Sequence, residues 1–450
     1  MNINIPDKVK FIIDTFYENN YEAFMVGGCI RDSLLLKEPK DYDIATSATP
    51  TITESLFDKT IPTGIKHGTI TVLIDKEPFE VTTYRVEGKY KDNRRPDEIS
   101  FVTDIKDDLS RRDFTINAFA YNSREGLKDY FNGLEDLKNR IIRTVGNGDK
   151  RFNEDALRIM RAIRFSAQLN FEIEINTLNS IKKNKELLKN ISAERIRDEL
   201  CKILISDNPR KGLILLRDCG VLNIIIPELI PLIGFNQRNK YHHEDVFKHT
   251  LSVVENTPNN LILRLSALFH DIGKPDCFFI DDDGNGRFFG HNNISEEIAE
   301  GILTRLHFDN KTIKTVCILI KEHMNVLDNP SNVAIKRLIN RVSVDNIHLL
   351  YSLQEADIKS LKIPDEALSK LNIMRDKTKF ILESKAPMST KDLAIDGGTL
   401  ISELSLVPGK IIGDTLNHLL QLVLDDPDLN NKDILLSEAK EYLKNLDNTK

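Results

Sequence analysis

Cysteine is scarce in this sequence, and long apolar runs are absent from it. The five cysteines are an odd number and form no Cys-x-x-Cys pair, which favours reduced thiols and a cytosolic setting. No apolar stretch approaches the roughly 18 to 20 residues that are needed to span a bilayer. The N-terminus carries acids among its apolar residues and lacks the layout of a signal peptide. We therefore expect a cytoplasmic protein with no membrane partner.

Excess positive charge is also missing overall, since the chain carries a net charge of −7. That average hides one basic segment. Residues 150–211 contain 14 Lys and Arg against 9 Asp and Glu, so the segment carries +5. A basic belt inside an acidic chain favours local binding of a polyanion such as a nucleic acid, rather than general adhesion to one.

Length and hydrophobic patterning predict a mixed first part and a helical remainder. At 450 residues the chain is long enough for about three domains. Strand-like alternation predicts a hairpin over residues 69–84, and Glu80 lies on its second strand. Residues 85–98 are almost devoid of apolar side chains and predict a mobile charged loop. Beyond residue 150 strand signals largely vanish, so we expect an α+β head followed by an all-α region.

The most informative stretch is GGCIRDSLLLKEPKDYDIAT, which runs from Gly27 to Thr46. On a strand, Asp41 and Asp43 would point to one face roughly 7 Å apart, where two carboxylates can share divalent metals. The glycines lie between a short apolar strand and a helical pattern, a turn that lets backbone N–H groups approach a phosphate. Taken alone, a pair of aspartates at this spacing is usually a surface pair, and a pair of glycines is usually a turn. Together they favour phosphoryl or nucleotidyl transfer. Glu80 is either a third metal-facing carboxylate or a surface acid on an edge strand.

A predicted helix over residues 154–169 places one acid and three arginines at successive i+3 positions, namely Asp155, Arg158, Arg161 and Arg164. An ordinary basic solvent face would also give this spacing. A carboxylate, however, accepts from the exocyclic amine of cytosine or adenine, and a guanidinium donates to the neighbouring ring acceptor. The same pair would meet a carbonyl on uracil or guanine. Asp155 and Arg158 are therefore candidate readers of a base.

Histidines and carboxylates recur along the helical region at His249, His270-Asp271, His291, His323 and Asp357. Such residues on successive helices can converge on a divalent metal. A metal-free helical core with buried or capping histidines is the alternative.

Four segments carry a resemblance to a known family: Gly27 to Asp32, Asp41 to Thr46, Arg111 to Ala118 and Glu154 to Arg158. In this order and spacing the chain resembles the bacterial tRNA nucleotidyltransferases, the class II CCA-adding enzymes, in the superfamily that includes DNA polymerase beta. The resemblance spans residues 20–230, and a weaker likeness continues through the HD-type run and the tail. It implies a polymerase-beta-like head with a mixed sheet (1–145), a helical neck (146–232), a helical body with the HD-type segment (233–375) and a helical tail (376–450), with tRNA held along the neck, body and tail.

The resemblance also implies site roles. Asp41 and Asp43 would bind Mg²⁺ in a two-metal site and activate the 3′-hydroxyl of tRNA. The other residues that match the family's motifs would bind the nucleotide. Gly28, Arg31 and Arg112 would contact the triphosphate, Asp155 and Arg158 would contact the base, and Arg161 and Arg164 would support the nucleotide. Residues 85–98 would be the family's flexible loop, which is associated with adding the final A.

The function expected from these features is template-independent addition of CCA to tRNA 3′ ends, in maturation and repair, from CTP and ATP and without an obligatory protein partner. An enzyme that adds only the terminal A, or a poly(A) polymerase, is similar over these motifs. A further alternative is an HD-type metal phosphohydrolase that uses another divalent metal at His249, His270, Asp271 and Asp357. The intact Asp41/Asp43 pair argues against a non-catalytic tRNA-binding protein.

Overall fold

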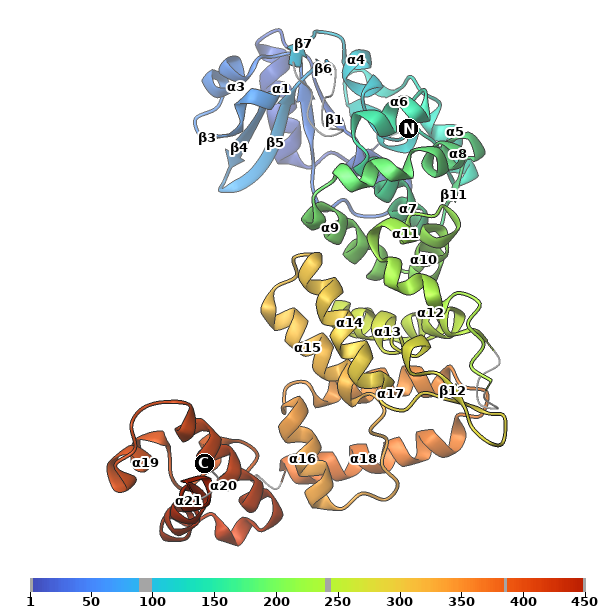
Figure 1. Ribbon diagram of the computed structural model, residues 1–450. Coiled ribbons are helices and arrows are strands. Elements are labelled where there is room, and N and C mark those ends of the chain that lie inside the picture. The colour runs from blue at the N-terminus through green and yellow to red at the C-terminus, as the bar shows by residue number, and fades with distance from the viewer. Residues whose placement is uncertain (1–2, 89–98, 239–243, 384–386, 448–450) are drawn as a thin grey trace. The chain divides into compact units, whose positions relative to one another are not determined.

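The computed structural model describes residues 3–88, 99–238, 244–383 and 387–447. The chain divides into two compact units, Met1–Ile230 and Pro231–Lys450 (Figure 1). None of the helices in these ranges has an apolar stretch long enough to cross a bilayer.

The first unit is built on a mixed seven-stranded sheet. Its strands are β1 (Ala23–Val26), β2 (Ile44–Thr46), β3 (Thr60–Gly64), β4 (Thr69–Ile74), β5 (Glu77–Thr83), β8 (Phe119–Asn122) and β9 (Gly126–Asp129). The spatial order is β3-β4-β5-β2-β1-β8-β9. Strand β2 runs parallel to β5 and antiparallel to β1, and the other neighbours are antiparallel. The hairpin predicted over residues 69–84 is present as β4 and β5.

Helices cover both faces of the sheet, which explains why every residue of β1 is buried. On one face Met25 packs in a core with side chains of α1 (Asp7–Glu18). On the other face Phe24 and Val26 pack with α4 (Ile105–Ser110). Successive side chains of a strand point to opposite faces, so one short apolar strand serves two cores. The central position of β1 also places the turn that follows it, at Gly27, in the middle of the sheet edge.

Two local predictions for the head are wrong in detail. Asp41 and Asp43 precede β2 instead of lying on it, although the Asp43 carbonyl still accepts the Val26 N–H at 2.9 Å. The predicted loop over 85–98 begins with a strand, because β6 (Arg85–Glu87) pairs with β7 (Ile99–Phe101). The Arg85 N–H also donates to the Asp108 carboxylate at 3.3 Å. The rest of that predicted loop, residues 89–98, lies outside the described residues.

The remaining elements of the first unit are helical apart from two residues each in β10 (Ile141–Ile142) and β11 (Glu172–Ile173), which pair in parallel. The helices are α2 (Gly28–Leu34), α3 (Pro50–Leu56), α5 (Gly133–Asn139), α6 (Gly148–Glu154), α7 (Leu157–Leu169), α8 (Ile175–Asn184), α9 (Ala193–Leu204), α10 (Pro209–Asp218) and α11 (Leu222–Ile225). The helix predicted over 154–169 is interrupted, since Asp155 is extended and its carboxylate accepts the Leu157 N–H at 3.1 Å.

The second unit is helical except for a small hairpin of β12 (Phe279–Ile280) and β13 (Gly286–Arg287). Its helices are α12 (Val246–Asn256), α13 (Leu261–Phe269), α14 (His291–Arg305), α15 (Asn310–Glu322), α16 (Asn332–Val342), α17 (Ile347–Lys359), α18 (Asp365–Glu383), α19 (Gly397–Leu404), α20 (Lys410–Asp425) and α21 (Lys432–Asp447). Asp245, Asn260 and Asp309 cap three of them by accepting a backbone N–H.

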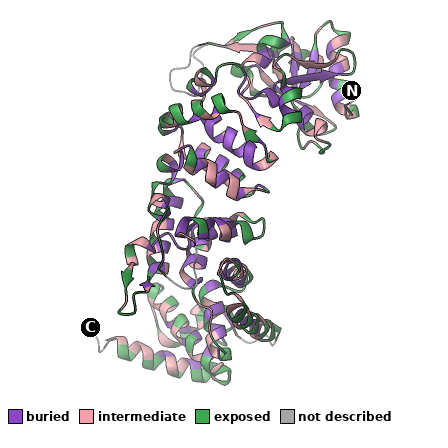
Figure 2. Cartoon of the chain, turned by 90° about the vertical axis from the view of Figure 1, so that its right-hand side faces the viewer, coloured by how far each residue is buried: buried purple, intermediate pink, exposed green. Residues whose placement is uncertain are grey.

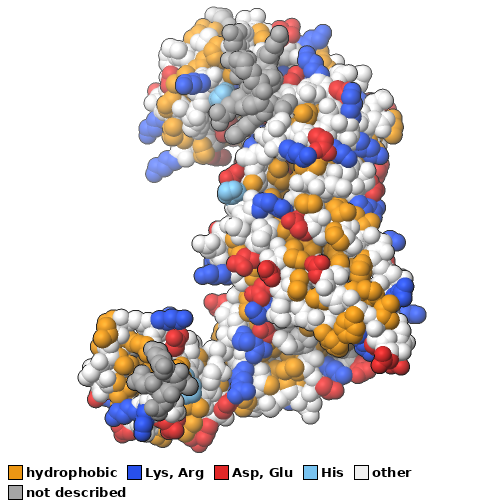
Figure 3. Space-filling view, viewed as in Figure 1, with side chains coloured by type: hydrophobic (Ala, Val, Ile, Leu, Met, Phe, Trp, Pro, Cys, Tyr) orange, Lys and Arg blue, Asp and Glu red, His pale blue; other side chains and the backbone are white. Residues whose placement is uncertain are grey.

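The helices of both units are buried along one side and exposed along the other (Figure 2). Basic and acidic side chains are interspersed over both units on the face shown in Figure 3. A concentration of positive charge is found instead inside a pocket of the first unit.

Candidate active site

A pocket of about 660 Å³ in the first unit brings together the residues that the sequence nominates for nucleotide and metal binding. Its lining includes Gly28, Arg31, Asp41, Asp43, Arg112, Asp155, Arg158, Arg161 and Arg164. These residues come from helix α2 directly after β1, the segment before β2, the turn after α4, the junction between α6 and α7, and helix α7 itself. Segments more than a hundred residues apart in the chain thus share one cavity.

The pocket wall also contains Gly27 of the glycine pair and residues that the sequence did not nominate for the site, namely Arg111, Asp113, Asn117, Leu157, Phe165, Arg195 and Lys202. Seven arginines and one lysine face only four aspartates, so the cavity is strongly cationic. Such a lining favours a polyanionic ligand, and a nucleoside triphosphate has that character.

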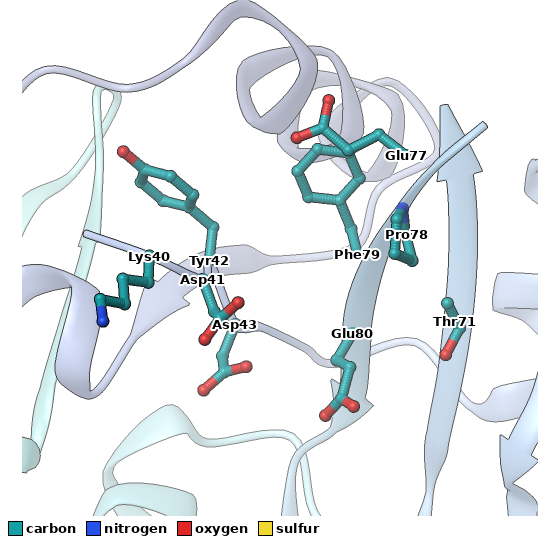
Figure 4. A pocket seen from close by; sticks show the side chains of 9 residues that line it. All are labelled: Lys40, Asp41, Tyr42, Asp43, Thr71, Glu77, Pro78, Phe79 and Glu80. Carbon is teal, nitrogen blue, oxygen red and sulfur yellow. The ribbon is translucent and has the colours of Figure 1, made fainter. Parts of the chain in front are cut away.

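Asp41 and Asp43 lie at the boundary between this pocket and a second hollow of about 580 Å³. Glu80 of β5 lines the second hollow with them, and Figure 4 shows the three carboxylates directed into the same space. Surrounding protein displaces water from the Asp43 carboxyl and raises its pKa, which Arg112 lowers and Asp41 raises further. Accessible carboxylate oxygens in such a group suit a hard divalent cation.

Gly27 fixes the turn beside these carboxylates. Its φ of 80° lies in the left-handed region, and its N–H donates to the Phe119 carbonyl at 3.1 Å. A Cβ at this position would lie 2.6 Å from Nη1 of Arg112. The positive φ therefore requires glycine, and a Cβ would in addition displace the guanidinium of Arg112.

The arginines are oriented by ion pairs inside the first unit. Arg31 donates from Nη1 to the Asn117 side-chain oxygen at 2.6 Å. Arg161 donates from Nε and Nη2 to Asp113 Oδ2 at 2.7 and 2.6 Å. Burial alone would raise the pKa of Asp113, but Arg161 and hydrogen bonding from Asn117 lower it to about 2. The paired Asp113 therefore stays ionised and holds Arg161 in place.

The base-reading candidates are not paired with each other. Arg158 donates to Glu154 Oε2 at 2.8 Å and to the Arg111 carbonyl at 2.8 Å. Asp155 instead accepts two bonds from Arg195 of α9, at 2.9 Å from Nη2 and 3.3 Å from Nη1. The partner of Asp155 is thus 40 residues away in the chain. The only sequence signal for Arg195 is the excess of basic residues over 150–211.

Phe165 is a second residue that the sequence did not nominate. Its ring lies 4.0 Å from the Arg164 guanidinium carbon, 5.0 Å from that of Arg31 and 5.4 Å from that of Arg161. An aromatic face attracts cations, so one ring partly offsets the repulsion among three guanidinium groups. Its position directly after Arg164 is the signal that could have identified it.

The second unit contains a separate cluster of histidines and carboxylates. His249 of α12 places Nε2 3.0 Å from Asp357 Oδ1, and His270 places Nε2 3.2 Å from Asp271 Oδ2. His291 and His323 approach the same Asp271 from the other side. The structure therefore brings together all six residues that the sequence nominated, and all but the partly exposed Asp357 are buried.

Charge in this cluster is strongly coupled. Burial would lower the pKa of His270, but Asp271 and Asp357 raise it to about 10. Burial, together with His270 and His291, lowers the pKa of His323 to about 3. Burial would raise the pKa of Asp271, yet His270 and Lys274 hold it well below its usual range. The cluster thus contains an ionised carboxylate, a neutral His323 and a protonated His270, and His270 would have to release a proton in order to bind a metal.

Comparison with known proteins gives matches along most of the chain. Residues 23–143 match the family described as "Poly A polymerase head domain", residues 170–233 the "Probable RNA and SrmB-binding site of polymerase A", and residues 287–439 a tRNA nucleotidyltransferase domain 2. The CCA-adding enzyme of Ligilactobacillus salivarius is 34% identical, with 98% of each chain covered. That of Lactobacillus helveticus is 36% identical, again over 98% of each chain.

Solved structures lead to the same family as the sequence matches. The CCA-adding enzyme of Bacillus stearothermophilus, in complex with CTP, has 26% identity and a TM-score of 0.69, with 98% of each chain covered. That of Thermotoga maritima, complexed with tRNA, shares the fold at 22% identity and a TM-score of 0.58, over 98% of this chain and 96% of that one. The prediction of a polymerase-beta-like head followed by helices is confirmed. The chain belongs to the family of CCA-adding enzymes.

Proposed function

We propose that the protein adds CCA to the 3′ ends of tRNA in the cytoplasm, in maturation and repair, using CTP and ATP without a nucleic-acid template. The observation that carries the proposal is the single cationic pocket that joins Asp41 and Asp43 to the arginines and to Asp155. The relatives named above support it, because they are CCA-adding enzymes and the solved complexes contain CTP or tRNA.

Asp41 and Asp43 are the proposed Mg²⁺ ligands, and their exposed oxygens fit a hard cation. Mg²⁺ bound there supplies charge stabilisation for the attacking 3′-oxygen of tRNA and the leaving pyrophosphate. Glu80 lines the same hollow and is a candidate for a further oxygen ligand. Burial raises the pKa of Asp43, and a neighbouring cation would favour its ionised form.

The remaining pocket residues bind the nucleotide. Arg31 and Arg112, which flank the turn at Gly28, hold the triphosphate, and Arg161 and Arg164 support it from α7. Asp155 accepts from the amine of cytosine or adenine, while Arg158 donates to the adjacent ring acceptor. Uracil and guanine present a carbonyl to the carboxylate at that point, so they are rejected.

The parts of the chain are assigned accordingly. Residues 1–145 form the catalytic head and 146–232 the neck, which contains the basic segment and reads the nucleotide. Residues 233–375 form the body, and 376–450 the tail. Neck, body and tail bind tRNA, in line with the described matches to an RNA-binding site and to a tRNA nucleotidyltransferase domain.

The test is addition to defined transcripts. Purified protein with Mg²⁺ receives tRNA transcripts that end before C, after C, after CC or after CCA, with each nucleotide supplied separately. We expect the protein to add C, C and A to the transcript in that order and then to stop adding nucleotides. Addition to the CC-ended transcript alone would identify an A-adding enzyme, and long A-tails on unrelated RNA would identify a poly(A) polymerase. Asp41→Ala should abolish addition while tRNA binding persists; surviving activity would refute the metal assignment.

We further propose that the second unit binds a divalent cation through His249, His270, Asp271 and Asp357. This proposal is supported by ligand atoms of the first three residues that all lie within 4.8 Å of one another. Nitrogen and carboxylate donors in such a set suit Mn²⁺, Co²⁺ or Zn²⁺. An HD-type phosphohydrolase activity would use this centre. The test is metal analysis of the full chain and of His270→Ala, and the variant should lose this ion. CCA addition should survive that loss.

A further inference from the structure

The most exposed cation in the lining of the cationic pocket is a lysine of α9. Arg195, Glu199 and Lys202 lie along one side of this helix, because positions i, i+4 and i+7 are neighbours on a helix surface. Arg195 and Lys202 both line the pocket. The Lys202 side chain is 48% exposed, whereas the seven arginines of the lining are between 11% and 34% exposed. Lys202 therefore lies at the mouth of the pocket, and the arginines lie deeper.

Glu199 is already paired without the charge of Lys202. Its buried carboxylate accepts from Arg164 Nε through Oε2 at 2.6 Å. The ammonium of Lys202 lies farther away, 3.3 Å from Oε1, which is longer than a strong charged hydrogen bond. Two cations and one carboxylate leave a charge of +1 on the three side chains. Because Lys202 is the member of this group that solvent reaches, its charge is available to an anion at the mouth of the pocket.

Two anions come to this pocket in the proposed function, the nucleoside triphosphate and the RNA strand. The triphosphate is assigned to Arg31 and Arg112, which lie deeper in the cavity than Lys202. The RNA has to bring its 3′-oxygen to Asp41 and Asp43 from outside, so its last backbone phosphates stay near the mouth. A lysine ammonium is a hydrated point charge on a flexible stem, and it contacts a phosphate without a fixed geometry. Lys202 therefore suits the RNA strand better than the triphosphate.

We propose that Lys202 binds a backbone phosphate near the 3′ end of the tRNA and holds the strand at the mouth of the nucleotide pocket. The inference rests on the proposed function and adds to it a residue of α9 that contacts the RNA. A phosphate contact positions a strand but carries no sequence information. Lys202 therefore serves strands that end before C, after C and after CC alike, and the choice of nucleotide is left to Asp155 and Arg158.

The test compares tRNA binding by the wild-type chain and by Lys202→Met, which keeps the apolar stem and removes the charge. Filter binding is measured without nucleotide, at several salt concentrations, for transcripts that end before C, after C and after CC. Because one charged contact is lost, Kd should rise roughly tenfold for all three transcripts. The dependence of log Kd on the logarithm of salt concentration should become shallower by about 1. CTP binding, measured by calorimetry, should stay unchanged.

Two variants serve as controls. Lys202→Arg keeps the charge and should bind tRNA as the wild type does. Lys128→Met removes a lysine of β9 that also pairs with a carboxylate, that of Glu125 at 2.9 Å, but lies outside the pocket lining, so its tRNA binding should not change.

Four results would overturn the inference alone: unchanged tRNA binding in Lys202→Met, weaker CTP binding in that variant, an equal loss in Lys128→Met, or an equal loss in Lys202→Arg. Weaker CTP binding would assign the lysine to the triphosphate instead. Absence of tRNA binding by the wild-type chain would refute the proposed function, and this inference with it.

Discussion

Arg195 is predicted to control nucleotide selectivity through Asp155, without contacting the base itself. Its guanidinium donates to both oxygens of Asp155, at 2.9 and 3.3 Å, and both side chains are about one quarter exposed or less. Because Oδ1 also accepts the Leu157 N–H, the carboxylate is held in one orientation. Arg195→Met keeps most of the apolar stem but removes the two charged bonds.

The expected magnitude follows from these contacts. Hydrogen bonds to charged groups contribute about 1.5–3 kcal/mol. A well-placed base contact discriminates by about 1–3 kcal/mol, and it depends on the orientation of the carboxylate. If the contact discriminates by about 3 kcal/mol and about half of that is lost, the loss of about 1.4 kcal/mol would lower the preference for CTP over UTP roughly tenfold.

The assay is single-nucleotide addition to a transcript that lacks CCA, with kcat/KM for CTP and UTP compared in each variant. Arg197→Met is the matched control, since Arg197 lies on the same helix but pairs with Asp198 outside the pocket lining. Unchanged selectivity with a lower kcat would show that Arg195 acts elsewhere. Tighter CTP binding in Arg195→Met would show that Arg195 competes with the base for Asp155, and the reasoning would be wrong.

Two further predictions concern the arginines of α7. Phe165→Leu keeps a large apolar side chain but removes the ring, so CTP binding measured by calorimetry should weaken about tenfold, since each cation–π contact contributes about 0.5–2 kcal/mol. Phe152→Leu, at a buried residue of α6, controls for the lost volume, and an equal loss there would argue for a general packing effect. The pKa of Asp113 is depressed to about 2, so its contribution to stability is present above about pH 4 and is lost as pH falls toward 2. The difference in unfolding free energy between wild type and Asp113→Asn, measured by urea titration, should narrow by about 2 kcal/mol over that interval; a constant difference would contradict the ion pair with Arg161.

Local patterns were sufficient to predict the hairpin of β4 and β5 and the helix-rich remainder. Alternating side chains and i+3 spacing are short-range signals, and tertiary contacts do not change them. The break between α6 and α7 was missed because the flanking residues favour helix, while Asp155 bonds the Leu157 N–H and leaves the helical conformation. A single side-chain contact decided that boundary.

The partners within the site could not be predicted in the same way. The i+3 spacing indicates that Arg158, Arg161 and Arg164 lie along one side of a helix, and all three line one pocket. The spacing could not show that Asp155 pairs with Arg195. That contact depends on how α7 packs against α9, which spacing along one helix does not contain. The histidines of the second unit differ, because residue types alone suggested that they could converge, although not that they would meet at Asp271.

The close approach of Arg112 to Gly27 makes two distant positions interdependent. A Cβ at position 27 would occupy the space of the Arg112 guanidinium, so an arginine 85 residues further along the chain would have to move to admit it. A shorter side chain at position 112 would relieve the clash but not the strain of a positive φ at position 27. A change at position 112 therefore cannot compensate fully for a substitution of Gly27. Among homologues, variation at position 27 should accordingly be rarer than variation at position 112.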